Sequence, residues 1–266
     1  MSRDVQLSGF PDIKPHRPVG YLPASVQAGT NADLIASVAP IYLTGSVLDV
    51  TYGGGKWWDR FTPDPFTFHD LHKVDGVDFT ALPHPDGSFD AVCFDPPYIV
   101  SGGESASRSE FQNAYGIGGH NLAMTNSEGG NRLLHDLIRS GLNECIRVSR
   151  CWVLVKCMEF SQGEGVHNAY GTDFHDMPYA VTTWALAAGC IKHDQIVHNA
   201  GTGPGGHNIF DPKRARRHHS YLLVFRKVGP RPIVADPACA QSSCIHCRNG
   251  KPAECAAPPY PGPVVR

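Results

Sequence analysis

The stretch FDAVCFDPPY, residues 89–98, begins as a buried strand and stops at a carboxylate followed by two prolines and a tyrosine. Neither proline has a backbone N–H, and Pro97 forces Pro96 into an extended conformation. The carbonyl oxygens of Asp95 and Pro96 can therefore face outward as acceptors, and an –NH2 group has two protons to donate to such a carboxylate and carbonyl. Tyr98 offers a flat face on which a planar base could stack, a contact worth ~1–3 kcal/mol. A plain proline turn with a surface tyrosine is the alternative interpretation.

Short strand-like segments alternate with helical ones on both sides of this stretch. The alternation predicts an α/β fold, with a mostly parallel sheet covered by helices on both faces. In such sheets ligands bind beyond the carboxyl ends of the strands, near the point where the strand order reverses. The predicted strands are 47–49, 66–71, 89–95, 151–160, 191–199 and 220–228, and the predicted helices are 25–43, ending near Pro40, 131–149 and 177–190.

The totals favour one large domain. The chain has 266 residues, a formal net charge of −2 and 41% hydrophobic residues. We divide it into an N-terminal arm (1–23), an α/β domain (24–228) and a Cys- and Pro-rich tail (229–266). No apolar run approaches the ~18–20 residues that span a bilayer, and the start lacks the apolar core of a signal peptide. We therefore expect a cytoplasmic protein without a membrane partner, whose nine cysteines are reduced thiols or metal ligands.

A second strand also ends in a loop suited to a ligand. The stretch VLDVTYGGG, residues 47–55, places Asp49 at the end of a strand and a run of glycines just after it. Glycine lets the backbone turn sharply and approach a ligand closely. Asp49 could order this loop or receive a cationic group. The spacing is not the G-x-G-x-x-G of dinucleotide sites, and an ordinary turn is the alternative interpretation.

Taken together, these segments resemble a known family. DPPY (95–98) resembles the catalytic motif of the S-adenosylmethionine-dependent amino-methyltransferases that act on adenine N6, and VLDVTYGGGKW resembles their cofactor loop, D-P-F-x-G-x-G-T. In that loop Val50 replaces Pro, Lys56 replaces Thr, and Thr51 or Tyr52 stands where Phe is expected. VDFTALPHPDGSFDAVCFDPPY (77–98) and HHSYLLVFRK (218–227) extend the similarity, and their order is more specific than any single motif. The resemblance implies a Rossmann-like class I methyltransferase fold, whose mostly parallel seven-stranded sheet has an antiparallel last strand.

The resemblance also implies roles for individual residues. Asp70 would hold the ribose hydroxyls of S-adenosylmethionine, with Asp75 as a rival. Asp78 would accept a hydrogen bond from the cofactor's adenine amine, and Phe79 would lie beside that ring. The expected cofactor-binding residues are Asp49, Thr51, Tyr52, Gly53, Gly55, Asp70, Asp78, Phe79 and Asp95, with Asp49, Gly53 and Gly55 along the methionine part.

Asp95, Pro96, Pro97 and Tyr98 would be the catalytic residues. Hydrogen bonds from the target amine to Asp95 and the Pro96 carbonyl would free the nitrogen lone pair for attack on the cofactor's methyl group, so that positioning supplies much of the acceleration. The base would be flipped out of double-stranded DNA and stacked on Tyr98. Adenine N6 is the expected target. Cytosine-N4 and RNA methylation stay open, as does a catalytically silent nucleic-acid-binding protein. Any restriction partner would be a separate protein.

Two glycine-rich stretches, 101–130 and 201–219, are the expected contacts to nucleic acid. Loops this long are often functional, and dense positive charge suits phosphate. A solvated loop is the alternative interpretation for the second stretch. The expected contact residues are Arg108, Lys213, Arg214, Arg216 and Arg217.

The tail contains four cysteines around a C-x2-C pair. Four thiolates complete a tetrahedral zinc site, so we expect structural zinc, with a disordered reduced tail as the alternative. The predicted ligands are Cys239, Cys244, Cys247 and Cys255. We expect no catalytic role for this metal, because methyl transfer needs none.

Overall fold

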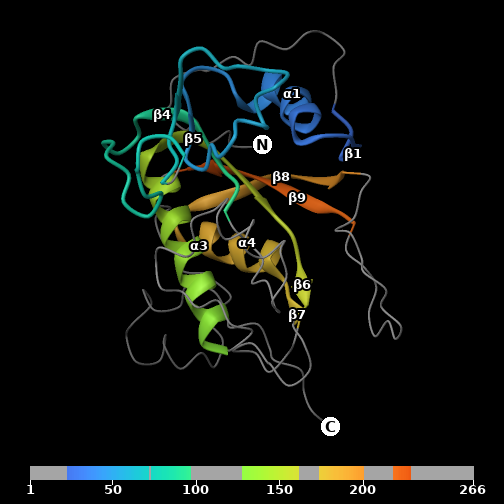
Figure 1. The fold of residues 1–266 in the computed structure, drawn as a ribbon, viewed down its shortest axis with the longest axis vertical. Coiled ribbons are helices and arrows are strands. Elements are labelled where there is room, and N and C mark those ends of the chain that lie inside the picture. The colour runs from blue at the N-terminus through green and yellow to red at the C-terminus, as the bar shows by residue number, and fades with distance from the viewer. Residues whose placement is uncertain (1–22, 72, 97–127, 162–173, 201–217, 229–266) are drawn as a thin grey trace, which may run out of the picture.

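The computed structural model describes residues 23–71, 73–96, 128–161, 174–200 and 218–228. Within them a seven-stranded sheet has the order β1-β8-β9-β5-β4-β2-β3, and a separate strand pair joins β6 to β7 (Figure 1). The main strands are β1 (Val26–Ala28), β2 (Val47–Asp49), β3 (Phe66–Phe68), β4 (Phe89–Phe94), β5 (Ser149–Cys157), β8 (Cys190–Asn199) and β9 (Ser220–Lys227). The smaller pair is β6 (Phe160–Ser161) with β7 (Phe174–His175), and the helices are α1 (Asn31–Tyr42), α3 (Glu128–Val148) and α4 (Met177–Ala187).

The directions of the strands confirm the predicted fold class. Strand β9, the last in the chain, runs antiparallel to both of its neighbours, β5 and β8. Every other neighbouring pair of this sheet is parallel. After β2 the chain first adds β3 on one side and then β4 on the other, so the strand order reverses at β2. This is the Rossmann-like architecture expected of a class I methyltransferase, and it places the crevice for ligands between the carboxyl ends of β2 and β4.

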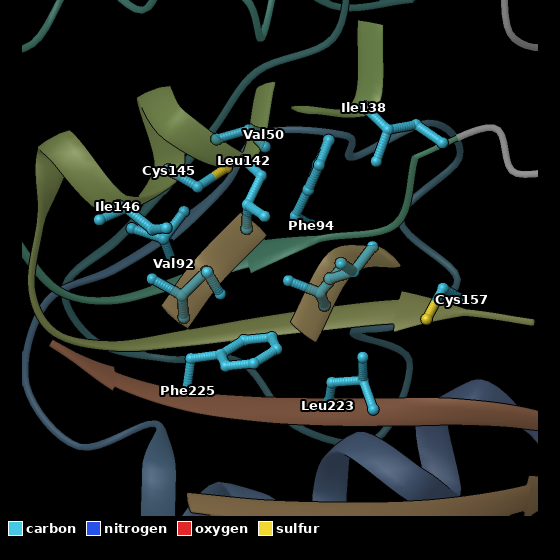
Figure 2. Close-up of a cluster of buried hydrophobic side chains, with 14 of the residues drawn as sticks. Val50, Val92, Phe94, Ile138, Leu142, Cys145, Ile146, Cys157, Leu223 and Phe225 are labelled. Atoms are coloured by element: carbon cyan, nitrogen blue, oxygen red, sulfur yellow. The ribbon is translucent and has the colours of Figure 1, made fainter. Parts of the chain in front are cut away.

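Helices cover both faces of the sheet (Figure 1). The face toward α3 and α4 is packed with aliphatic side chains, and Ile138, Leu142 and Ile146 of α3 lie over Val92 and Phe94 of β4 (Figure 2). These α3 residues have the helical spacing read from the sequence, so the predicted amphipathic helix is confirmed. A second apolar cluster, on the opposite face, includes α1.

The first predicted helix begins later than expected. Residues Val26–Ala28 form β1 at the edge of the sheet, beside β8, and Gly29 turns the chain with φ +119°. Thr30 then caps α1 in a capping box with Asp33, a local signal that fixes the start of a helix. Pro40 lies inside α1, which continues to Tyr42. The prediction of a helix across 26–28 was therefore wrong.

Smaller differences concern the ends of elements. Helix α3 already begins at Glu128, inside the stretch predicted as a loop. Helix α4 ends at Ala187, because Gly189 has φ +85°. Strand β3 ends at Phe68 rather than at residue 71. Among the described helices, none combines the length and the hydropathy needed to cross a bilayer.

Candidate active site at the carboxyl ends of β2 and β4

The two loops predicted to form the site lie side by side. Strands β2 and β4 are parallel, with Asp49 opposite Cys93. Just beyond them, the amide of Val50 donates to the Cys93 carbonyl at 3.2 Å. The amide of Asp95 donates to Thr51 Oγ1 at 2.8 Å. The carboxylate at 95 and the glycine turn at 53–55 therefore belong to one site.

Asp49 holds the glycine loop in place through two hydrogen bonds. Its Oδ1 accepts from the Thr51 amide at 2.9 Å, and its Oδ2 accepts from Trp58 Nε1 at 2.7 Å. The residue is only 3% exposed, and burial raises the pKa of its carboxyl to about 7, with the nearby charge of Asp95 adding to the rise. Of the two roles predicted for Asp49, ordering the loop is the one these contacts show. Contact with the methionine part of the cofactor stays a prediction.

The turn itself depends on glycine at two positions. Gly53 and Gly55 have φ +57° and +71°, values that side chains rarely permit. A Cβ on Gly55 would also lie 2.6 Å from the Tyr52 hydroxyl oxygen. Tyr52 stacks on Phe68, with ring centroids 4.1 Å apart. Of the two residues that could stand where Phe is expected, Thr51 accepts the Asp95 N–H, and Tyr52 packs its ring over the turn.

Asp70, rather than its rival Asp75, lies at the glycine turn. Asp70 Oδ2 accepts from the Gly53 amide at 2.8 Å, and Oδ1 accepts from the Lys73 amide at 2.8 Å. The Asp75 carboxylate binds His69 Nδ1 at 2.6 Å. Asp70 therefore has the position expected of the ribose-binding carboxylate, and its contact with a ribose stays a prediction.

Asp78 and Phe79 lie on a loop attached to α3. The Asp78 carboxylate accepts from the amide and the hydroxyl of Thr80, both at 2.8 Å. Phe79 packs on Phe94 at the end of β4, with ring centroids 5.2 Å apart. A Cβ on Gly141 of α3 would lie 2.5 Å from the Phe79 ring. The absence of a side chain at 141 therefore lets this loop lie close to α3.

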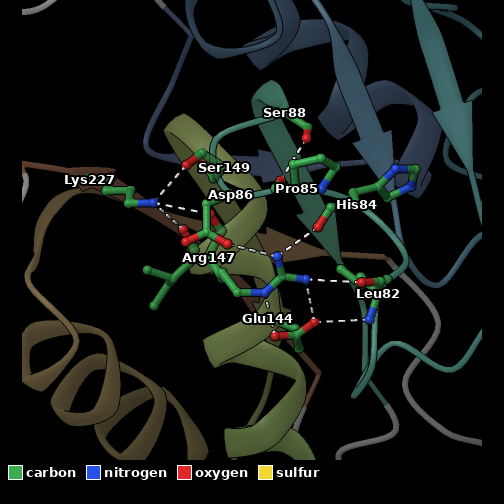
Figure 3. Close-up of polar contacts among 10 residues, drawn as sticks. Leu82, His84, Pro85, Asp86, Ser88, Glu144, Arg147, Ser149 and Lys227 are labelled. Carbon is green, nitrogen blue, oxygen red and sulfur yellow. Dashed lines mark hydrogen bonds and ion pairs between the residues drawn. The ribbon is translucent and has the colours of Figure 1, made fainter.

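Arg147 of α3 holds the next part of that loop (Figure 3). Its guanidinium donates to the carbonyls of Leu82 at 3.0 Å and His84 at 2.7 Å. Glu144 pairs with Arg147 and also accepts from the Leu82 amide at 2.9 Å. These bonds fix the segment after Phe79 on the helix surface, a function that the sequence pattern did not reveal.

The Asp95 side chain has a buried oxygen atom without a hydrogen-bond partner among the described residues. The residue is partly exposed as a whole, yet its Oδ1 is buried and makes no hydrogen bond with any described residue. Burial raises the pKa of Asp95, opposed by the positive charge of Lys156 and by the indole N–H of Trp57. The Trp57 N–H is close enough to stabilise the ionised form of Asp95. It is nevertheless buried and has no well-aligned hydrogen-bond partner among the described residues. An unpaired acceptor and an unpaired donor thus lie together.

Asp95 also belongs to a row of polar side chains that the sequence analysis missed. Each lies at or next to one end of a strand, all at the same edge of the sheet. Because side chains alternate along a strand, they lie on the face where Cys93, Leu154 and Ile196 enter the α1 cluster. Apart from Asp95, the members are at most 8% exposed. In sheet order the row is Asp49, Asp95, Lys156, Ser220 and His198. A charged residue inside the apolar stretch CWVLVKC was the available signal for Lys156.

Several predicted residues lie outside the described residues. They are Pro97, Tyr98, Arg108, Lys213, Arg214, Arg216, Arg217, Cys239, Cys244, Cys247 and Cys255, together with the arm, the tail and most of the two glycine-rich stretches. Their contacts therefore stay predictions. Among the described residues, no group of three or more His, Cys, Asp or Glu side chains is placed to hold a metal ion.

Comparison with known proteins shows similarity of fold. No protein-family profile matches the sequence, and no curated protein matches it. A candidate DNA modification methylase from Thermus thermophilus, solved with S-adenosyl-L-methionine, is similar over 56% of this chain and 49% of its own, at 13% identity and TM-score 0.33. This chain thus matches about half the length of that protein.

Two further solved structures cover more of the chain. An S-adenosylmethionine-dependent methyltransferase from Methanosarcina mazei is similar over 69% of this chain and 92% of its own, at 9% identity and TM-score 0.37. The 1,6-didemethyltoxoflavin-N1-methyltransferase of Burkholderia thailandensis is similar over 75% of this chain and 79% of its own, at 10% identity and TM-score 0.40. At such identities the likeness concerns the fold, and the chemistry has to be inferred from the site.

Proposed function

We propose that this protein transfers a methyl group from S-adenosylmethionine to an exocyclic amine of a nucleobase, with N6 of adenine in double-stranded DNA as the first substrate to test. One observation carries the proposal. A buried carboxylate oxygen without a hydrogen-bond partner among the described residues, Asp95 Oδ1, lies just after β4, beside the strand at which the strand order reverses. Buried polar groups are normally paired, so this oxygen fits an incoming donor.

The surrounding residues fit the cofactor. The turn at Gly53 and Gly55, whose positive φ angles favour glycine, lies beside the ends of β2 and β4, and Asp70 lies at that turn. When bound there, S-adenosylmethionine supplies a methyl group on a sulfonium, which is already activated for transfer. The tail cysteines would hold a separate structural zinc.

The chain's own task is then to hold the amine. The Asp95 carboxylate and the Pro96 carbonyl would each accept one N–H of the target, which favours a tetrahedral nitrogen with a free lone pair. The nitrogen would form a bond to the methyl carbon as the carbon–sulfur bond breaks and leaves a neutral thioether, and the positively charged nitrogen would then lose a proton to water. Tyr98 would stack on the base, and the basic stretch 213–217 would contact phosphates.

Nucleoside mass spectrometry tests the proposal directly. The protein is incubated with S-adenosylmethionine and, in separate reactions, with duplex DNA and RNA, beside Asp95→Asn. We expect a methylated amine on DNA with the wild type and none with Asp95→Asn, and calorimetry measures how much of that loss comes from weaker cofactor binding. Methylcytosine at N4 or methylation of RNA alone would correct the substrate. Failure to bind S-adenosylmethionine would refute the proposed function.

A further inference from the structure

Lys156 is a buried ammonium on the strand next to Asp95. The residue is 6% exposed, and its Nζ donates to Asn31 Oδ1 of α1 at 2.7 Å. On neighbouring β4, Phe94 lies opposite Val155, so the next residues along the two strands, Asp95 and Lys156, are neighbours as well. A buried ammonium is costly unless it has partners, so its place beside Asp95, whose Oδ1 has no hydrogen-bond partner among the described residues, requires an explanation.

The packing on both strands points the two side chains to the same side of the sheet. Val153, Val155 and Cys157 of β5 enter the cluster with α3, whereas Leu154 enters the cluster with α1. Lys156 alternates with them and lies on the α1 side, where its Asn31 contact is. On β4, Cys93 is the member of the α1 cluster, and Asp95 follows it by two residues.

The charges around Asp95 leave Lys156 as the cation of this site. From β2 the Asp49 carboxyl faces Asp95, and on β5 the Cys157 thiol is close enough to respond to its charge. The charge of Lys156 also acts on His198 of β8, whose Nε2 donates to the Gly29 carbonyl at 3.0 Å. Among these described groups, only Lys156 brings a positive charge that acts on Asp95.

We propose that Lys156 is a positioning residue: held by Asn31, its ammonium keeps the buried Asp95 side chain a carboxylate, ready to accept the substrate amine. The effect of Lys156 on methyl transfer rests on the proposed function, since a protonated Asp95 would offer the amine one acceptor fewer. The link between the two residues does not rest on that function. Lysine suits the role because its compact charge acts without requiring the bidentate geometry of arginine.

The charge link is measured without any substrate. In protein labelled with 13C at the aspartate carboxyls, the Asp95 signal is assigned from its loss in Asp95→Asn and followed between pH 4 and 9. We expect Lys156→Met to raise the midpoint of Asp95 by about one pH unit or more, because an opposite charge nearby lowers a carboxyl pKa by about 1–3 units. Lys192→Met is the matched control, because this lysine is on β8 with its ammonium on Gln195. An Asp95 midpoint that is the same in wild type and Lys156→Met overturns the proposal.

A second measurement covers the case in which Lys156→Met folds poorly. Thermal unfolding is compared for wild type, Lys156→Met, Asp95→Asn and the double variant. We expect Lys156→Met to lower the melting temperature much less in the Asp95→Asn background, because the carboxylate that needs the charge is gone. Equal losses in the two backgrounds would show that the side chains are not coupled and would overturn the proposal.

Activity then separates this proposal from the proposed function. We expect Lys156→Met to lower kcat at least 10-fold near pH 7 with KM for S-adenosylmethionine changed less than threefold, and raising the pH to recover part of the loss. Lys156→Arg, which keeps the charge, should have a higher kcat near pH 7 than Lys156→Met. A loss that is the same at every pH counts against a role in ionisation. If the wild type transfers no methyl group, the proposed function fails, while the Asp95 midpoint still decides the role of Lys156.

Discussion

The amide of Asp95 donates a 2.8 Å hydrogen bond to the Thr51 hydroxyl, which connects the loop after β4 to the loop after β2. The same hydroxyl lies 3.5 Å from Asp49 Oδ1. Thr51 therefore connects the Asp49 carboxylate at the end of β2 to the backbone of Asp95 just after β4. Together with the hydrogen bond from the Val50 amide to the Cys93 carbonyl, it fixes the start of the glycine loop beside Asp95.

Thr51→Val should destabilise the protein and impair any methyl transfer. Valine has the same shape but cannot accept the Asp95 N–H, and leaving such a group unpaired costs about 1–3 kcal/mol. Thr51→Ser keeps the hydroxyl and is the control. Denaturant unfolding measures the free energy, and initial rates measure the transfer. Equal behaviour of the valine and serine variants would show that the hydrogen bond is unimportant.

Gly55→Ala and Gly54→Ala should differ sharply although they are neighbours. At Gly55 the backbone has φ +71° and a Cβ would lie 2.6 Å from the Tyr52 hydroxyl, whereas a Cβ on Gly54 meets nothing within 4 Å. We expect Gly55→Ala to lower the free energy of unfolding by about 1–3 kcal/mol and to weaken cofactor binding. Gly54→Ala should stay within about 0.5 kcal/mol of wild type. Calorimetric titration and chemical unfolding check both variants.

Asp70→Ala should weaken binding of S-adenosylmethionine more than Asp75→Ala does. Asp70 holds the Gly53 amide at the turn, and Asp75 holds His69 instead. A loss of about 1.4 kcal/mol corresponds to tenfold in affinity, so we expect at least that for Asp70→Ala. A larger loss of affinity for Asp75→Ala, measured by calorimetry on folded protein, would reverse the assignment of the two carboxylates.

Asp49 should make stability depend on pH in an unusual direction for a carboxyl group. Its pKa is about 7 in the folded protein against an ordinary 3.8, so the folded state binds more protons than the unfolded chain between these values. The free energy of unfolding then falls as pH rises from about 4 to about 7. In Asp49→Asn, the decrease in the free energy of unfolding over this pH range should be smaller than in the wild type by about 2–4 kcal/mol.

The control for this pH series is Asp59→Asn, which changes an aspartate that is 56% exposed. Unfolding by urea at several pH values measures the difference between each variant and the wild type. A slope that Asp49→Asn leaves unchanged would mean that Asp49 is ionised throughout this range.

Gly141→Ala should destabilise the domain even though alanine favours helices. The new Cβ would lie 2.5 Å from Phe79 and 2.8 Å from Phe94, and overpacking of this kind costs about 1–3 kcal/mol. Ser140→Ala, at the exposed neighbour on α3, should be neutral or slightly stabilising. Thermal unfolding of the two variants decides between close packing and helix propensity.

Local patterns were sufficient for most of the elements. The alternation of apolar strands and amphipathic segments predicted six of the strands of the main sheet, because burial on one or both faces leaves a periodic trace in the sequence. The start of α1 was missed although the Thr30–Asp33 capping box was visible in the sequence. Strand β1 was missed because it is a largely exposed edge strand, and its sequence, VQA, has no run of apolar residues like those of the buried strands.

The fold class could be predicted from the alternation of strand-like and helical segments, and the two loops of the candidate site from strands that end in DPPY or in a glycine run, because such local patterns carry their own backbone constraints. Two relationships became visible only in the folded sheet: Asp70 rather than Asp75 lies at the turn, and Lys156 lies beside Asp95. Those relationships depend on which strands are neighbours and in what register. Neither is encoded in a local stretch of chain, because residues far apart in the sequence meet only when the sheet forms.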